Sequence, residues 1–170
     1  MRFIVLATFF AAGFPGALAA HPDGAPWGSA DPEAAENCAS CHYDSEAVRD
    51  SSALTLTGVS GGVTANKIYE ITLAFRNPDE TETGFQAIAS AGEFETAHNE
   101  HMEINGAQIR STKTSKSQNG SVQWIINWRA PASISPGEEI IFLVAVNDSN
   151  HDESPFGDHI HYATFRRMGE

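Results

Sequence analysis

Hydrophobic and polar residues alternate along much of the chain after residue 50, and this period of two predicts β-strands. In residues 67–75, KIYEITLAF, the alternate positions from Tyr69 to Phe75 are apolar and share one face. Residues 121–131, SVQWIINWRAP, repeat the pattern with Val, Trp, Ile and Trp, whereas residues 138–148, EEIIFLVAVND, are apolar on both faces and predict a central strand. Four further strands are expected, in residues 52–59, 84–90, 106–112 and 157–165.

Turn residues separate these segments, and the number of short strands between them indicates the fold class. About seven short strands, with Gly, Asn and Pro between them, predict an all-β domain at residues 51–170, an immunoglobulin-like antiparallel β-sandwich. Residues 21–50 are rich in Pro, Gly and acidic side chains before the pattern begins. They predict a short irregular leader, with one or two helical turns between Ala34 and Val48.

The first 20 residues, MRFIVLATFFAAGFPGALAA, have one early arginine, an apolar run and small residues near a cut after Ala19 or Ala20. This is the pattern of a secretory signal peptide. The mature protein is therefore expected in the periplasm or outside the cell. No later apolar run reaches the roughly 20 residues that a membrane-spanning helix needs.

The formal net charge is -12, and loss of the one positive charge of Arg2 with the signal gives -13. Such an acidic protein is a poor partner for nucleic acid or an anionic membrane surface. The expected partner is a protein with a basic docking surface.

The two cysteines of the chain stand in the sequence Cys38-Ala39-Ser40-Cys41-His42. C-x-x-C-H is the attachment signature of c-type haem, in which both thiols form thioethers with the porphyrin and the histidine binds iron on the proximal side. An exported chain meets the compartment in which haem is attached. A disulfide or a zinc site remains an alternative, although zinc would need further ligands and reduced thiols outside the cytoplasm.

The chain contains GAPWG before the cysteine motif, then LTLTGVSGGVTANKIYEITLAF, GFQAIA, WIINWRAP and a closing GDHIHYATF. These segments resemble the bacterial reeler-like domain known as choice-of-anchor V. The resemblance spans about Gly24 to Phe165 and implies an exported β-sandwich that carries a haem. Members of that family often have a His-Thr pair shortly before the tryptophan strand, where this chain has Ser111-Thr112. The second axial ligand is therefore not transferred from the family.

Other residues of this chain are candidates for the distal iron ligand. His98, His101 and Met102 occur together in an expected loop. His159 and His161 are two apart on an expected strand, so they share a face. That face is expected to point outward, with Ile160 and Tyr162 in the core. The alternative for each histidine is an ordinary surface position.

Copper is a second candidate metal. A cut after Ala20 leaves His21 as the amino terminus, whose amine and imidazole bind copper well, and His159 or His161 would complete the site.

The preferred interpretation is an exported mono-haem protein that transfers single electrons, with an open distal site for a small gas as a variant of it. The alternative is a copper-binding or adhesive sandwich module whose cysteines form a disulfide. The sequence shows no nucleophile beside a base and no phosphate loop, which argues against a hydrolase or a transferase.

Overall fold

A computed structural model describes residues 24–79, 81–97, 101–150, 152 and 154–170. The predicted signal peptide, residues 1–20, and His21 lie outside these ranges. Within them, no helix is long and apolar enough to cross a membrane.

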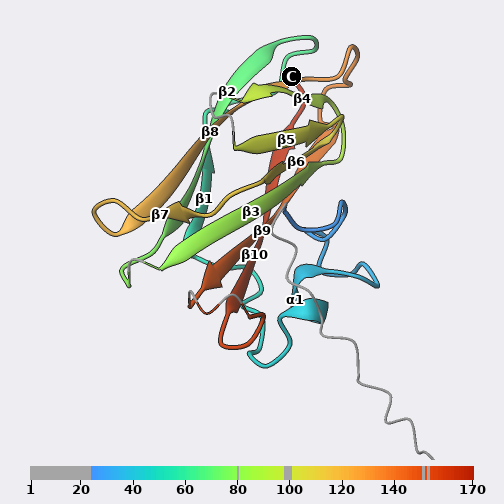
Figure 1. The fold of residues 1–170 in the computed structure, drawn as a ribbon. Helices are drawn as coiled ribbons and strands as arrows, with labels where there is room; N and C mark the ends of the chain where they lie inside the picture. The colour runs from blue at the N-terminus through green and yellow to red at the C-terminus, as the bar shows by residue number, and fades with distance from the viewer. Residues whose placement is uncertain (1–23, 80, 98–100, 151, 153) are drawn as a thin grey trace, which may run out of the picture.

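The described chain forms one short helix and ten strands (Figure 1). The helix α1 is Cys38–Cys41. The strands are β1 Leu54–Thr57, β2 Ile68–Arg76, β3 Glu82–Ala89, β4 Glu93–Ala97, β5 Met102–Asn105, β6 Gln108–Ser111, β7 Ser115–Lys116, β8 Ser121–Arg129, β9 Glu139–Ser149 and β10 His159–Met168.

The strands form two sheets. One has the order β1-β2-β8-β4, and the other has the order β10-β9-β3-β6-β5 with β7 beside β3. All pairs of these strands are antiparallel. Side chains from both sheets meet in one large hydrophobic cluster, which confirms the predicted antiparallel β-sandwich.

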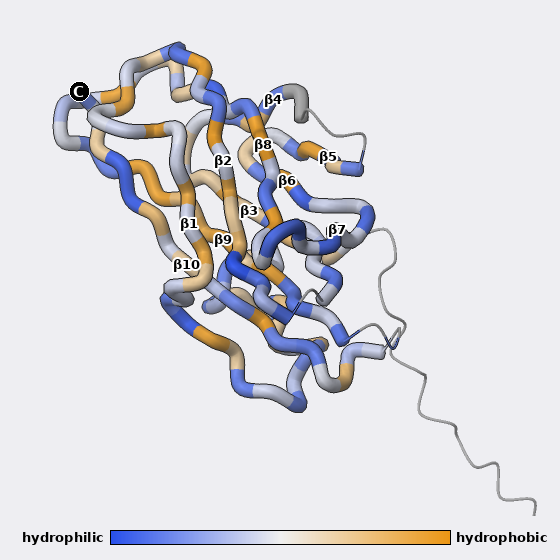
Figure 2. Tube along the Cα trace, turned by 90° about the vertical axis from the view of Figure 1, so that its left-hand side faces the viewer, coloured by the Kyte–Doolittle hydropathy of each residue, from blue (hydrophilic) through white to orange (hydrophobic). Residues whose placement is uncertain are grey.

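Strands β2 and β8 show how the sequence pattern produces this core. Alternate side chains of both strands are buried, and the register places Tyr69 opposite Trp128 and Leu73 opposite Trp124. Both tryptophans are almost fully buried, as expected from their shared face. Orange hydrophobic positions recur along the strands in Figure 2.

The sheet that contains β9 and β10 is covered on both faces. Its inner face contributes Val144, Val146 and Ala163 to the core between the sheets. Its outer face buries a second cluster, made of Ala145, Ile160 and Tyr162 from the strands together with Ala30 from the leader, and Cys38, Ala39, Ala47 and Ile88 pack against it. This explains why β9 is apolar on both faces.

The second cluster corrects one sequence-based expectation. Ile160 and Tyr162 are buried, but they lie under the leader on the outer face of the sheet and not in the core between the sheets. His161 consequently faces inward, where its ring lies 4.8 Å from that of Phe75 on the other sheet. Alternation reveals two faces but not which of them is the interior when both are covered. His159 is exposed, as expected.

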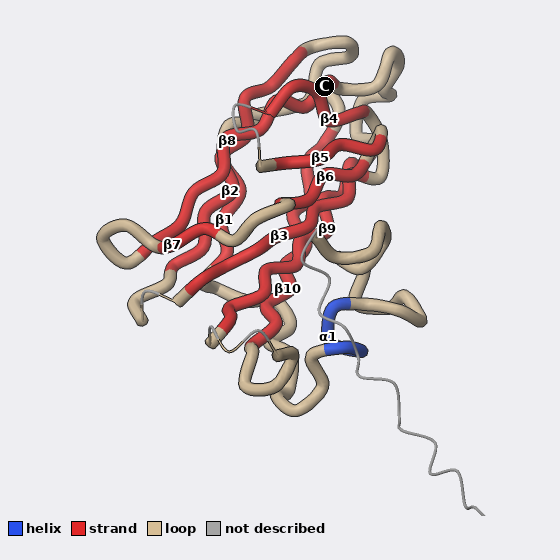
Figure 3. The backbone as a smooth tube through the Cα atoms, in the orientation of Figure 1, coloured by secondary structure: helices blue, strands red, loops and turns tan. Residues whose placement is uncertain are grey.

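The leader is held on this outer face by hydrogen bonds as well as by apolar contacts. The amide of Ala30 donates to Oε1 of Gln86 at 2.9 Å, and Nε2 of Gln86 donates to the carbonyl of Pro26 at 2.8 Å. Gln86 is fully buried, so both of its polar groups are satisfied by the leader. The guanidinium of Arg110 lies 4.4 Å from the ring of Trp27. Figure 3 shows the leader as loop with α1 beside β9 and β10.

Three strands were not expected from the sequence: β4, β5 and β7. All are short, β4 and β5 lie at sheet edges, and β7 has two residues. Short polar edge strands carry little alternation signal. The turn that leads into β8 is at Asn119 and Gly120, which have φ values of 55° and 78° and lie inside an isolated antiparallel bridge between Gln118 and Ser121. This turn was expected from the Asn-Gly pair.

Candidate functional site

The cysteine motif forms a capped turn of helix. The side chain of Asn37 accepts a hydrogen bond from the amide of Ser40 at 3.2 Å, and the Ser40 hydroxyl accepts one from the amide of Asn37 at 3.0 Å. This reciprocal capping box stabilises α1 although the helix has four residues. The amide of His42 donates to the carbonyl of Cys38 at 3.1 Å and closes the turn.

The two thiols are free and have different surroundings. Cys38 packs against the outer-face cluster near Tyr162, and burial, followed by the neighbouring Cys41, raises the pKa of its thiol to about 12. Cys41 is exposed. The helix therefore turns one thiol toward the sheet and the other toward solvent.

The imidazole of His42 lies against a buried carboxylate. Its Nδ1 is 2.9 Å from Oδ2 of Asp158, which precedes β10 and is 2% exposed. Asp158 also accepts hydrogen bonds from Nδ2 of Asn147 at 2.9 Å and from the amide of Asn150 at 3.1 Å. Burial would raise the pKa of Asp158, but these contacts, that with His42 first, outweigh it and hold the pKa below its usual value. Asp158 is thus a fixed negative group behind His42.

The loop between β9 and β10 is joined to the same segment. The amide of Gly157 donates to Oδ2 of Asp44 at 2.7 Å, and the rings of Tyr43 and Phe156 meet edge to face with centroids 5.7 Å apart. The cysteine motif and this loop therefore form one structural unit, although more than 100 residues separate them.

Sequence reasoning did not identify Asp158, Tyr162 or Phe156 as part of the site. In the segment GDHIH, His159 and His161 were the predicted ligands, whereas Asp158 is the residue that contacts His42. A signal was present, because an acidic residue at the start of a buried strand needs a polar partner.

None of the four described candidates for the distal ligand lies beside His42. His101 and Met102 are at the start of β5, whereas α1 contacts β10, and the two strands form opposite edges of the sheet. Four strand spacings of roughly 4.8 Å separate these edges by about 19 Å. His159 and His161 alternate with Ile160 and Tyr162, so they point to the face of β10 opposite the one that the cysteine segment covers. His98 lies outside the described residues.

His161 has a structural setting. Its Nδ1 lies 2.9 Å from the hydroxyl oxygen of Ser51, which is buried and also accepts the amide of Ala53 at 3.3 Å. Burial, followed by the charge of His159, lowers the pKa of His161, and the charge of Asp148 partly opposes this. The Ser51–His161 contact therefore joins the segment before β1 to strand β10.

The copper hypothesis depends on His21, which lies outside the described residues. Among the residues that the structure describes, no group of three or more His, Cys, Asp or Glu side chains could hold a metal ion. The copper site therefore remains a prediction.

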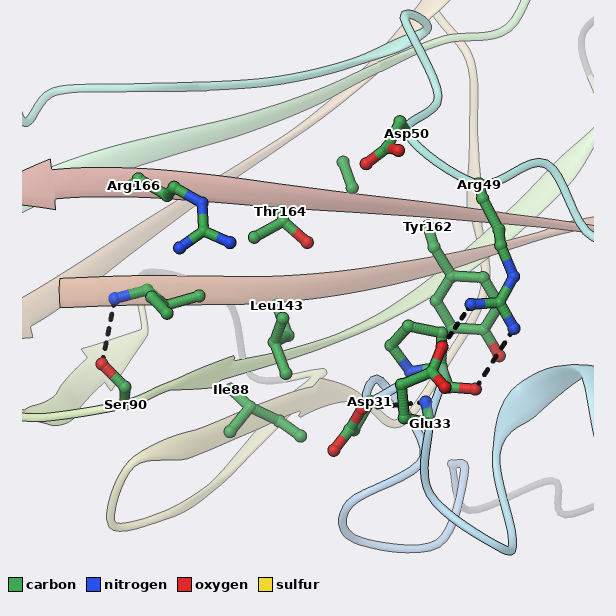
Figure 4. A pocket seen from close by; sticks show the side chains of 13 residues that line it. Asp31, Glu33, Arg49, Asp50, Ile88, Ser90, Leu143, Tyr162, Thr164 and Arg166 are labelled. Carbon is green, nitrogen blue, oxygen red and sulfur yellow. Dashed lines mark hydrogen bonds and ion pairs between the residues drawn. The ribbon is translucent and has the colours of Figure 1, made fainter. Parts of the chain in front are cut away.

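A pocket of about 410 Å³ opens on the outer face of β3, β9 and β10. Ile88 and Leu143 lie in its floor, and Arg49 and Arg166 stand at opposite ends (Figure 4). Tyr162 lines this pocket and also contacts the α1 segment. No cysteine or histidine is among the lining residues, so the cysteine motif lies beside the pocket and not within it.

The donor set of the motif fits a covalently attached haem. Two unpaired thiols are available, and the carboxylate at Nδ1 favours the tautomer with its proton on Nδ1, which leaves the lone pair of Nε2 for a metal. The Cys38 thiol, which packs against the sheet, would have to turn outward to join Cys41 on one porphyrin edge.

No protein-family model and no curated protein sequence matches the chain. Among solved structures, the chain is similar to the Reelin-N domain of F-spondin, with a TM-score of 0.55, 14% identity, and coverage of 78% of this chain and 96% of that one. It is also similar to the human F-spondin reeler domain, with a TM-score of 0.52, 14% identity, and coverage of 73% and 95%. These likenesses confirm the reeler-like β-sandwich fold that the sequence led us to expect.

Proposed function

We propose that this protein is an exported reeler-like β-sandwich that carries one haem, attached through Cys38 and Cys41 with His42 as the proximal iron ligand, and that it exchanges single electrons with a partner protein. The observation that carries the proposal is the 2.9 Å contact between Nδ1 of His42 and the buried carboxylate of Asp158. A histidine that ligates a metal generally has its second ring nitrogen held by a carboxylate, a backbone carbonyl or water.

A haem bound here would supply a one-electron redox centre. The protein would determine where this haem lies and how its iron ligand is oriented. The capping box of α1 fixes the spacing of Cys38 and Cys41, and Asp158 fixes the orientation of His42. Because Asp158 is itself held by Asn147 and Asn150, the imidazole is oriented by a rigid group and not by a mobile side chain.

The partner is proposed to present a basic surface, since the chain has a formal net charge of -12. The sixth ligand also stays a prediction: His98 is still a candidate, and an open sixth position would bind a small gas instead.

A second candidate is a binding or adhesive β-sandwich module in which the cysteines have a structural role. The packing of the half-buried Cys38 against the outer-face cluster favours it, because a thiol with a raised pKa is rarely in the reactive thiolate form. The reeler-like fold is compatible with such a module and with a protein partner.

One experiment separates the two candidates. The full chain is expressed in a host with a cytochrome c maturation system, and the purified protein is examined by its reduced-minus-oxidised spectrum, its pyridine haemochrome and acid extraction. Haem that resists extraction in the wild type and is lost in Cys38→Ala/Cys41→Ala supports the haem protein. An unmodified mass and no Soret band in a competent host would overturn it and leave the interaction module.

A further inference from the structure

Two aromatic side chains beside the cysteine motif are exposed and contact each other. Tyr43 is 56% exposed and Phe156 is 49% exposed, and they are the aromatic members among the exposed large hydrophobic residues of the described chain. Their rings meet at 5.7 Å with an interplanar angle of 83°. The two exposed aromatic side chains of the described residues are therefore in contact with each other.

Phe156 is held in this exposed position by its loop. Its carbonyl accepts a hydrogen bond from Nδ2 of Asn150 at 3.0 Å, and its amide donates to the hydroxyl of Ser154 at 3.1 Å. The backbone amide of Asn150 donates to Asp158, the carboxylate that contacts His42. The same buried group thus fixes both the imidazole and the loop that presents Phe156.

The position of Tyr43 indicates what could cover the pair. Tyr43 directly follows His42, and the exposed Cys41 is two residues before it. A porphyrin joined to the Cys41 sulfur by a thioether and coordinated by His42 must lie within a few ångströms of both residues. Cofactor sites are lined mainly by hydrophobic and aromatic side chains, which exclude water from the apolar macrocycle.

We propose that Tyr43 and Phe156 form a wall of the porphyrin site and shield one part of the attached macrocycle from water. This inference rests on the proposed haem attachment and adds to it the loop between β9 and β10 as a second element of the site. An edge-to-face aromatic pair can turn one ring flat against a porphyrin while the other supports it.

The test uses Tyr43→Ser and Phe156→Ser in the haem-loaded full chain. Ile68→Ser is the matched control, because Ile68 is 46% exposed on β2, away from the site. Covalent haem, measured by haem staining of a denaturing gel, should be the same in all variants. The reduction potential should fall in both wall variants, since water stabilises the more highly charged ferric state, and bleaching by hydrogen peroxide should become several-fold faster.

Tyr43→Phe should keep the wild-type potential, because the proposed wall needs the ring and not the hydroxyl. Wall variants that match Ile68→Ser in potential and bleaching, while the wild type carries covalent haem, would overturn the inference alone. Absence of covalent haem in the wild type would instead overturn the proposed function and the wall with it.

Discussion

The hydroxyl of Tyr162 accepts a hydrogen bond from the amide of Ala39 at 3.1 Å and donates one to Oδ1 of Asn37 at 3.3 Å. This single side chain on β10 therefore bonds both the helix that holds the cysteines and its cap, across 123 residues of sequence. Its burial raises its pKa to about 12, so the hydroxyl stays protonated at physiological pH.

Tyr162→Phe should loosen the leader. The substitution keeps the ring in the outer-face cluster but leaves the Ala39 amide without its partner, which costs about 1 to 2 kcal/mol. We expect a lower free energy of unfolding in urea and faster limited proteolysis within residues 24–50.

Tyr69→Phe is the matched control for this change. The Tyr69 hydroxyl likewise accepts an amide, that of Thr64 at 2.9 Å, but it lies on β2 away from the leader. A similar loss of unfolding free energy without faster cleavage of the leader is expected. Equal cleavage rates in the two variants would contradict the assigned role of Tyr162.

The two thiols of the haem-free protein should react at very different rates. Cys38 packs against the sheet and has a pKa of about 12, so almost none of it is thiolate at pH 8, whereas Cys41 is exposed. Iodoacetamide should modify Cys41 at least about tenfold faster, as measured by peptide mass spectrometry. Both should react alike in urea, and equal rates in the folded protein would show that the packing of Cys38 against the sheet does not protect its thiol.

Asp158→Asn should alter the acid stability. Because the folded state lowers the pKa of Asp158, this carboxylate contributes stability above its unfolded pKa of roughly 3.9, and the contribution is lost as the pH falls through the folded value. We expect the variant to be less stable than the wild type at pH 7 by about 1 to 3 kcal/mol. As the pH is lowered, the unfolding free energy of the variant should fall less than that of the wild type. Urea titrations at several pH values between 2 and 7 measure both effects.

The same substitution should raise the reduction potential of the haem-loaded protein. A carboxylate at Nδ1 increases the electron donation of the imidazole and favours ferric iron, so its replacement by a neutral amide favours ferrous iron. Spectroelectrochemical titration measures the change. Asn147→Ala, which removes a support of Asp158 but leaves the charge, should shift the potential less.

His161 should destabilise the fold as the pH falls below neutrality. Its pKa is lowered in the folded state, so its contribution to stability is present above the unfolded pKa of roughly 6.5 and is lost as the pH falls through the folded value. We expect His161→Gln to flatten the pH dependence of the unfolding free energy below about pH 6.5. A wild-type and a variant profile of equal slope in this range would contradict the assignment.

The sequence pattern predicted the sandwich and its longest strands because their alternation arises from burial against one core. It placed Ile160 and Tyr162 in the wrong layer because the leader creates a second buried face, which looks the same as the first to any periodicity argument. The motif at Cys38 to His42 was visible as a local spacing. Its partners Asp158 and Phe156 were not, since they reach it through pairings of distant segments that no local pattern encodes.

The placement of Asp158 and Tyr162 near the end of the chain sets an order of assembly. The cysteine segment is synthesised before the groups that hold it. These groups are the hydroxyl of Tyr162, which lies on β10, and the carboxylate of Asp158, which immediately precedes that strand. Cys38 and Cys41 are therefore synthesised before the sheet that later holds them. In the proposed haem protein, an attachment machinery would meet both thiols in an accessible segment, and the pairing of β10 would then fix the finished site in place.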